Sequence, residues 1–225
     1  FFLRIMEQTL LLLQLSDSAF PTGGFSHSLG LESSVQHRQI LHTEDLKSFI
    51  TCALENAGSF NLPFVREAYT SCSDLKTLQQ LDRLCNISTA NHIANRASSR
   101  QGRSMADTAS KVFQTDDLHQ LSSGLKHRHY PVVFGAVCGC LGLPLEVTLA
   151  SFMSGLARTT VASAVRLDKL GPVEAQKTLA VLQKLIPDII ARNQSRSAED
   201  ACITFPVMDV LQNCHDKLFC KLFYS

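Results

Sequence analysis

The side chains best suited to metal chemistry are four histidines and two closely spaced cysteines: His27, His127, His129, His215, Cys138 and Cys140. Transition-metal sites bring three or four such ligands together, often through patterns such as H-E-x-x-H or paired C-x-x-C. Neither pattern occurs in the chain, and the two cysteines lie in an apolar run, where cysteine packs as a small hydrophobic residue. We therefore interpret these residues as structural and predict no metal site, with a weak intrinsic site as the alternative.

Nucleophilic and phosphate chemistry also lacks its usual sequence patterns. The segment Gly23-Gly24-Phe25-Ser26 does not reproduce the G-x-S-x-G nucleophile elbow. Its paired glycines precede a helical segment and could offer backbone N–H groups to an anion. However, no P-loop or G-x-G-x-x-G pattern is present, and no lysine lies nearby. We predict a non-enzymatic protein without a cofactor, in which this segment is a tight turn between helices; direct ligand contact is the alternative.

Two groups of basic residues have helical spacing: Arg96, Arg100 and Arg103, and Arg158, Arg166 and Lys169. The first group would share one helix face, which indicates a solvated surface or, alternatively, contact with an acidic partner. The second group interrupts a nearly apolar segment. Because a buried charge needs a partner, we expect Arg166 either to pair with an internal carboxylate or to reach an interface.

The elements that position these residues are predicted to be helices. Apolar residues spaced by three and four between Leu46 and Ala57 predict one helix, with Thr43 as its N-cap. Gly171 is expected to close a helix and Pro172 to open the next, which Pro187 should bend. The apolar segment 129–166 predicts two buried helices divided near Pro144. Strand-like alternation and hairpin dipeptides are lacking, so we predict an all-α fold of about ten helices.

Composition sets the broader limits. The 225 residues, 45% hydrophobic and 18% charged, can form one domain (1–225) with apolar surface left for partners. A net charge of +1 argues against nucleic acid, and no apolar run is long enough to span a membrane. Eight scattered cysteines indicate reduced thiols and hence the cytoplasm. The polar stretch 193–200 is the expected flexible loop.

Five segments, in order along the chain, carry a specific combination of residues. They are LQLSDSAFPTGGFSHSLGLE (13–32), with Pro21, Gly23, Gly24, Phe25 and Gly30; Gln101-Gly102-Arg103; HYPVVFG (129–135), with Pro131 and Gly135; AVRL with a later LG (164–171); and HD with a later KLFYS (215–225). Together they resemble the ordered motifs of the UreF family of urease accessory proteins over nearly the whole chain. Any one of these motifs alone would be unspecific.

Two positions depart from the family pattern. Lys221 stands where the family usually has arginine, and Asp216 stands where it usually has glutamate. Lysine cannot reproduce the planar, bidentate contact of arginine. A contact that the family arginine makes in this way is therefore expected to be weaker or different here.

The resemblance implies an all-α, homodimeric scaffold. Such a protein binds the accessory protein UreD (also called UreH) and recruits the nickel-carrying GTPase UreG to apo-urease. One alternative is control of GTP hydrolysis by UreG, and another is direct nickel carriage through His27, His129, Cys138 and Cys140. We expect residues 215–225 to form a tail that orders on binding UreD/UreH. The expected partner-binding residues are Arg158, Arg166, Lys169, Phe219, Lys221, Leu222, Phe223 and Ser225.

Overall fold

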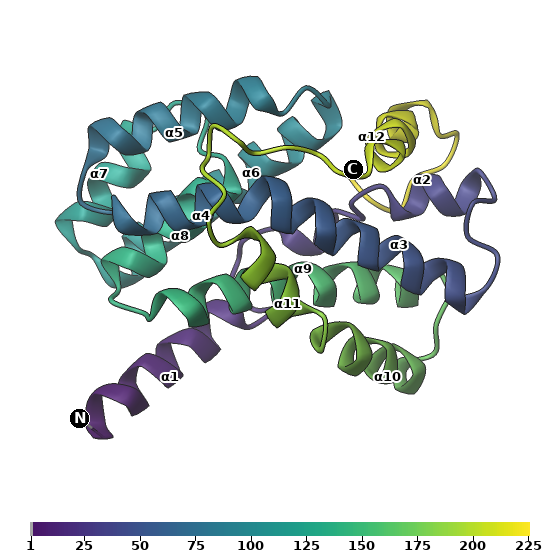
Figure 1. Ribbon diagram of the computed structural model, residues 1–225, viewed down its shortest axis with the longest axis horizontal. Helices are drawn as coiled ribbons and strands as arrows, with labels where there is room; N and C mark the ends of the chain where they lie inside the picture. The colour runs from purple at the N-terminus through teal and green to yellow at the C-terminus, as the bar shows by residue number, and fades with distance from the viewer. Residues whose placement is uncertain (1) are drawn as a thin grey trace.

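The computed structural model describes residues 2–225, and in this range every regular element is helical (Figure 1). The all-α prediction is confirmed. The α-helices are α1 (Phe2–Ser16), α2 (Leu31–Gln36), α3 (Thr43–Asn56), α4 (Leu62–Thr70), α5 (Leu75–Ser88), α6 (His92–Phe113), α7 (Asp116–Gly124), α8 (Tyr130–Cys140), α9 (Leu145–Arg166), α10 (Pro172–Gln183), α11 (Ile186–Asn193) and α12 (Pro206–Asn213). Three short helical turns complete them: η1 (Gly24–Ser26), η2 (Ala57–Asn61) and η3 (Cys214–Lys217).

Helices α4 and α8 form the centre of the core. Helices α5, α6 and α7 lie on one side of this pair, and α9, α10 and α11 lie on the other (Figure 1). Phe64 and Val65 of α4 and Val133 of α8 are fully buried. A Cβ atom on Gly135 would lie 2.1 Å from the carbonyl oxygen of Val65, so this glycine lets the two backbones approach closely. The predicted burial of the 129–166 segment follows from this central position.

The boundary between α8 and α9 lies where the sequence predicts it. Helix α8 ends at Cys140 and α9 begins after Pro144, where the chain was expected to divide. The start of α3 differs by one residue, because His42 is the N-cap and Thr43 is already helical. The Asp45 carboxylate stabilises this start by accepting the backbone N–H groups of Leu41 and His42 at 3.0 and 2.9 Å.

Two predictions around α10 need correction. Gly171 does not close the preceding helix, since α9 ends at Arg166 and Gly171 is the N-cap of α10. Pro172 opens α10, as expected. Pro187 was expected to bend a continuous helix, but the chain leaves the helix at Lys184 and restarts as α11. Because proline fits the first turn of a helix, Pro187 begins α11 instead of bending α10.

The segment 193–200 is non-helical after Asn193, as predicted, but it is tied to α4. The Arg66 guanidinium donates to the carbonyl oxygens of Asn193 and Arg196. The backbone N–H of Ala198 donates to Glu67 Oε1 at 2.6 Å. Ala198 is also buried. These contacts fix the path of a loop that composition alone indicates to be flexible.

Helix α1 extends away from the other helices in its first half (Figure 1). Leu3, Ile5 and Met6 are exposed there, and Leu10 and Leu13 are exposed further along the helix, whereas Leu15 is buried near its end. A hydrogen bond from Gln8 Nε2 to the carbonyl oxygen of Gly142 attaches α1 to the start of α9. Within residues 2–225, no helix combines the length and apolarity that crossing a bilayer requires. All eight cysteines are free thiols, but only Cys85 and Cys138 are buried, whereas Cys202 and Cys220 are exposed, so the burial expected for reduced thiols holds for part of them.

Candidate partner-binding surface around the C-terminal tail

The C-terminal tail (residues 215–225) pairs with the signature loop (residues 17–30). The backbone N–H of Tyr224 donates to the carbonyl oxygen of Ser26 at 2.8 Å. The backbone N–H of Ser28 donates to the carbonyl oxygen of Ser225 at 2.7 Å. In Figure 1 the end of the yellow segment lies beside α2 and α12. Two of the sequence motifs, which are far apart along the chain, therefore form one structural unit.

Glu32 holds the tail through its backbone. This residue lies in the first turn of α2 and is only 1% exposed. Its Oε1 atom accepts the N–H of Leu222 at 2.6 Å, and its Oε2 atom accepts the N–H of Phe223 at 3.1 Å. A buried carboxylate is stable only when such donors replace water. Gly30, with a φ of 87°, makes the turn that brings Glu32 into this position.

Arg166 connects the tail to the signature loop at the end of α9. Its guanidinium lies 4.0 Å from the ring centroid of Phe25 and 4.1 Å from that of Phe223. It also donates a hydrogen bond to the carbonyl oxygen of Phe25. No carboxylate pairs with it in the part of the chain that the structure describes. Of the two alternatives for Arg166, the internal ion pair is not formed, because two aromatic faces and a carbonyl group satisfy the charge instead.

The arginine stripe of α6 also meets the tail. Arg96 forms a bidentate contact with Asp216, with N–O distances of 3.1 and 2.8 Å. The Arg96 hydrogen bond lowers the pKa of Asp216 to about 2. Arg100 lies over the ring of Tyr224 at 4.1 Å, whereas Arg103 is exposed. The stripe was expected to face solvent or an acidic partner, but two of its members bind the chain's own C-terminal segment.

Two buried histidines complete the contact. His27 Nδ1 lies 2.7 Å from Ser225 Oγ, and His215 Nε2 lies 3.3 Å from the carbonyl oxygen of Phe223. Burial lowers the pKa of His27 to about 4, with smaller contributions from nearby cations, and burial also lowers the pKa of His215. Both histidines are therefore neutral at pH 7 and act as hydrogen-bonding groups.

The other candidate metal ligands lie in structural environments. His129 Nε2 contacts Asn86 Oδ1 and its Nδ1 contacts Ser98 Oγ, each at 3.2 Å. Cys138 is fully buried in the core. Within residues 2–225, no group of three or more histidine, cysteine or acidic side chains is arranged to hold a metal ion.

The glycines of the motifs allow close contacts between segments. Gly23 has a φ of 74°, and a Cβ atom on Gly24 would lie 2.6 Å from Gln101 Nε2. The two glycines permit a turn and a close contact, as expected, but the connection from α1 to α2 is a longer loop that contains η1 and not a tight turn between helices. On the opposite side of the same motif, a Cβ atom on Gly102 would lie 1.9 Å from the carbonyl oxygen of Arg128. The Gln101-Gly102 pair therefore lies between the signature loop and the start of α8, where Pro131 occupies the first turn.

We expect Gly102→Ala to lower the free energy of unfolding by about 2 kcal/mol, because the new methyl group meets a backbone carbonyl that cannot rotate away. Gly155→Ala is the matched control. Gly155 lies within α9 with open space around its Cβ position, so alanine should stabilise the helix by about 0.5–1 kcal/mol. Urea denaturation measures both variants. Equal effects of the two substitutions would contradict the close contact at Gly102.

In the structure, the remaining expected partner-binding residues of the tail fall into an exposed group and a buried group. Phe219 and Leu222 are exposed on the tail, and Lys221 Nζ lies 4.0 Å from Asp216 Oδ1. Phe223 and Ser225 are buried against their own chain, so neither is available to a partner while the tail is docked. In this structure the tail packs against α2, α6 and the signature loop, and its ordering on binding UreD/UreH stays a prediction.

Arg158 and Lys169 are both exposed, but the structure gives neither a contact with the tail. Lys169 lines a cavity of about 270 Å³ together with Leu41 and His42.

Sequence reasoning missed two buried acids, Glu32 and Asp82. The available signal for Glu32 was an acid between the apolar Leu31 and the small residues that follow it.

Comparison with known proteins identifies the family. A UreF family model matches residues 40–183. Urease accessory protein F of Oryza sativa subsp. indica is 37% identical over 220 residues, covering 93% of this chain and 82% of the rice protein. The Arabidopsis thaliana protein of the same name is 36% identical over 218 residues, covering 94% and 90%. Urease accessory protein UreF of Trichodesmium erythraeum is 35% identical over 230 residues, covering 97% of each chain. The family match spans more than half of the chain and confirms the resemblance of its motifs: this chain belongs to the UreF family.

Proposed function

We propose that this protein is a non-enzymatic scaffold in urease maturation. In this role it binds a UreD/UreH-type accessory protein and recruits the nickel-carrying GTPase UreG to apo-urease. It acts in the cytoplasm, as a homodimer, and requires neither nucleic acid nor a membrane. The names of its relatives support the urease connection, since they are described as urease accessory proteins.

The observation that carries the proposal is the convergence of separate motifs on one surface. Phe25, Leu222 and Tyr224 are 64%, 60% and 57% exposed where the signature loop meets the tail. Arg166 and Arg100 stack against this group from α9 and α6. Exposed aromatic residues supported by arginine are typical of the residues that dominate interface energetics. We assign this surface to the UreD/UreH-type partner.

The test is co-expression with a UreD/UreH-type protein, followed by affinity capture and size-exclusion chromatography. We expect the two chains to elute as one stable complex, because an apolar surface with aromatic anchors gains free energy when a partner covers it. A Tyr224→Asp variant places a charge in this surface and should reduce capture. Separate elution of the wild-type chains would count against the scaffold.

A second candidate function is regulation of GTP hydrolysis by UreG. The exposed basic residues Arg158 and Lys169 favour it, because they are available to an anionic partner. UreG turnover measured with the wild-type chain and with Arg158→Ala, Arg166→Ala and Lys169→Ala variants tests this function. Unchanged turnover in all mixtures would remove it.

Direct nickel carriage is the least supported alternative. His27 and His129 each have hydrogen-bond partners from their own surroundings, and Cys138 is buried among apolar residues. Equilibrium dialysis of the purified chain against micromolar nickel is the direct test. Stoichiometric binding would revive this alternative.

A further inference from the structure

The docked tail is held by a cluster of ionisable side chains that are almost completely inaccessible to water. His27, Glu32 and His215 are 4%, 1% and 0% exposed. Within the last four residues of the tail, Glu32 accepts hydrogen bonds from two, and His27 and His215 each contact one. The Nδ1 atom of His215 has no hydrogen-bond partner and lies 3.9 Å from Glu32 Oε2. Tail docking thus buries two imidazole rings in a position where neither can take up a proton without cost.

We propose that docking of the C-terminal tail is proton-linked, so that protonation of His27 and His215 releases the tail from the signature loop. The contact between His27 and Ser225 joins the signature loop to the tail and exists only while the tail is docked. His215 belongs to the tail itself, and docking places its ring against Glu32 of α2. Release of the tail exposes both rings to water. The proposed partner surface is built from the same tail, so its regulation by pH rests on the proposed function, whereas the proton linkage itself does not.

The charges around His27 oppose its protonation. Arg96 and Arg100 of α6 face it, and His215 of η3 lies on another side. Arg166 of α9 adds a further cation where the signature loop meets Phe223. Burial acts in the same direction and is the largest cause of the low pKa of His27. The docked state therefore strongly favours the neutral ring.

The charges around His215 are mixed. Glu32 of α2 and Asp216 of η3 favour the protonated ring, as does the carbonyl oxygen of Phe223, whereas Lys221 of the tail opposes it. Burial outweighs these contributions and lowers the pKa of His215. His215 therefore reinforces the proton linkage of His27, with a smaller effect.

The direction of the pH effect follows from these shifts. When the tail is released, His27 regains an ordinary pKa of 6.5, whereas in the docked state its pKa is about 4. The released state therefore binds more protons, and docking weakens as the pH falls. The contribution of neutral His27 to docking is fully present above pH 6.5 and decreases progressively between pH 6.5 and pH 4. For His27 alone, the docking equilibrium constant should fall by about 30-fold between pH 7.5 and pH 5.

Amide hydrogen exchange of the full chain tests the proposal. The N–H groups of Leu222, Phe223 and Tyr224 are all hydrogen-bonded to Glu32 or Ser26 in the docked state, so their protection reports docking. After correction for intrinsic exchange, we expect protection of these amides to fall at least 10-fold from pH 7.5 to pH 5. In a double His27→Gln, His215→Gln variant the same amides should lose most of this pH dependence.

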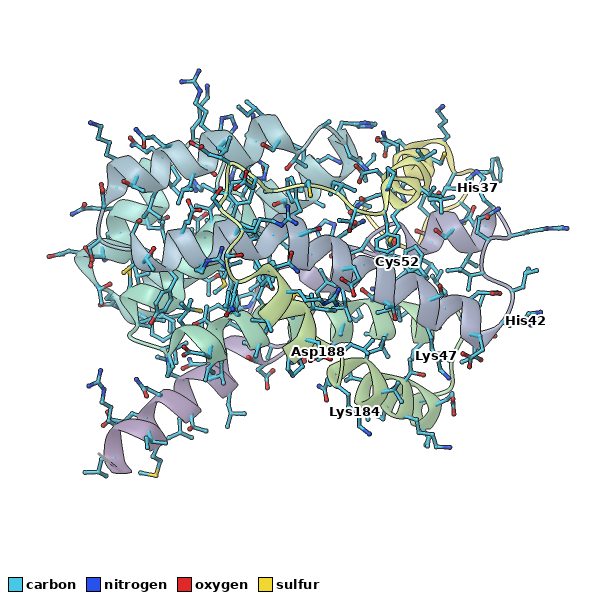
Figure 2. The ribbon with its side chains drawn as sticks, viewed as in Figure 1. His37, His42, Lys47, Cys52, Lys184 and Asp188 are labelled. Atoms are coloured by element: carbon cyan, nitrogen blue, oxygen red, sulfur yellow. The ribbon has the colours of Figure 1, made fainter. Side chains whose placement is uncertain are left out.

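His37→Gln is the matched control, because His37 is an exposed histidine at the end of α2 (Figure 2), and its ring is hydrogen-bonded to the carbonyl oxygen of Ser33 in the same helix. It should keep the wild-type pH dependence. If the double variant cannot dock its tail even at pH 8, the histidine ring resonances of the wild-type chain replace it as the readout. Titration of both buried rings near pH 6.5, or pH-independent protection in the wild-type chain, would overturn the proposal. No partner protein enters these measurements, so failure of the scaffold function and failure of the proton linkage are separate outcomes.

Discussion

Arg166→Ala is expected to weaken binding of a UreD/UreH-type protein by roughly 100-fold, which corresponds to the loss of one interface hot spot. The guanidinium stacks on Phe25 and on Phe223 and donates to the carbonyl oxygen of Phe25. Without it, the exposed ring of Phe25 and the buried ring of Phe223 lose the group that holds them together. Isothermal titration calorimetry measures the effect at pH 8, where His27 of the signature loop and His215 of the tail are both neutral.

Two variants separate this role from a general loss of charge. Arg158→Ala removes an exposed arginine of the same helix and should bind like the wild-type chain. Arg166→Lys keeps the charge but lacks the planar group that covers two rings, so we expect intermediate binding. Equal loss for Arg158→Ala and Arg166→Ala would argue that net charge, and not the stacked arrangement, determines binding.

Asp82→Ala is expected to lower the free energy of unfolding by about 3 kcal/mol, the largest effect on stability that we predict. Asp82 is 1% exposed, and its two carboxylate oxygens accept the backbone N–H groups of His127 and His129 at 2.8 and 2.9 Å. Alanine leaves both donors without a partner just before α8 begins. For a chain of this length the midpoint of thermal unfolding should fall by about 6–12 °C, as measured by calorimetry.

Two acidic positions provide the comparison. Asp82→Asn keeps one acceptor oxygen and should cost less than Asp82→Ala. Asp74→Ala removes an exposed N-cap that accepts the N–H groups of Lys76 and Thr77, and should cost about 1 kcal/mol. If Asp82→Ala were no more destabilising than Asp74→Ala, the buried carboxylate would not be the main support of this loop.

Hydrophobic spacing predicted the helical architecture well because each helix buries one face. The stripe from Leu46 to Ala57 lies in α3, and the apolar segment divided near Pro144 became α8 and α9. The exact positions of the helix ends were harder to predict from the sequence. The N-cap of α3 is His42 and not Thr43, and the chain breaks before Pro187 where a bend was expected. Both features depend on side-chain contacts and turn geometry, which the spacing of apolar residues does not contain.

The arrangement of the candidate surface could not be derived from local patterns. Arg166 was correctly singled out as a charge in an apolar segment, but its partners, Phe25 and Phe223, come from opposite ends of the chain. Likewise, the spacing of Arg96 and Arg100 gave a shared helix face without revealing that the tail covers it. Glu32 and Asp82 accept backbone N–H groups, and residue types do not reveal which amides these carboxylates accept. Long-range hydrogen bonds of this kind can be identified only in the three-dimensional structure.

The pairing of the signature loop with the tail also has a consequence for biosynthesis. Ser28 and Ser225, which are hydrogen-bonded, are separated by 197 positions in the chain. At typical rates of translation, roughly 10–40 s pass between the synthesis of the two segments. During this interval the carboxylate of Glu32 has no tail amides to bind, and closing so long a loop carries a large entropic cost. The signature loop therefore stays open until the tail has been synthesised, and docking of the tail is a late step in folding.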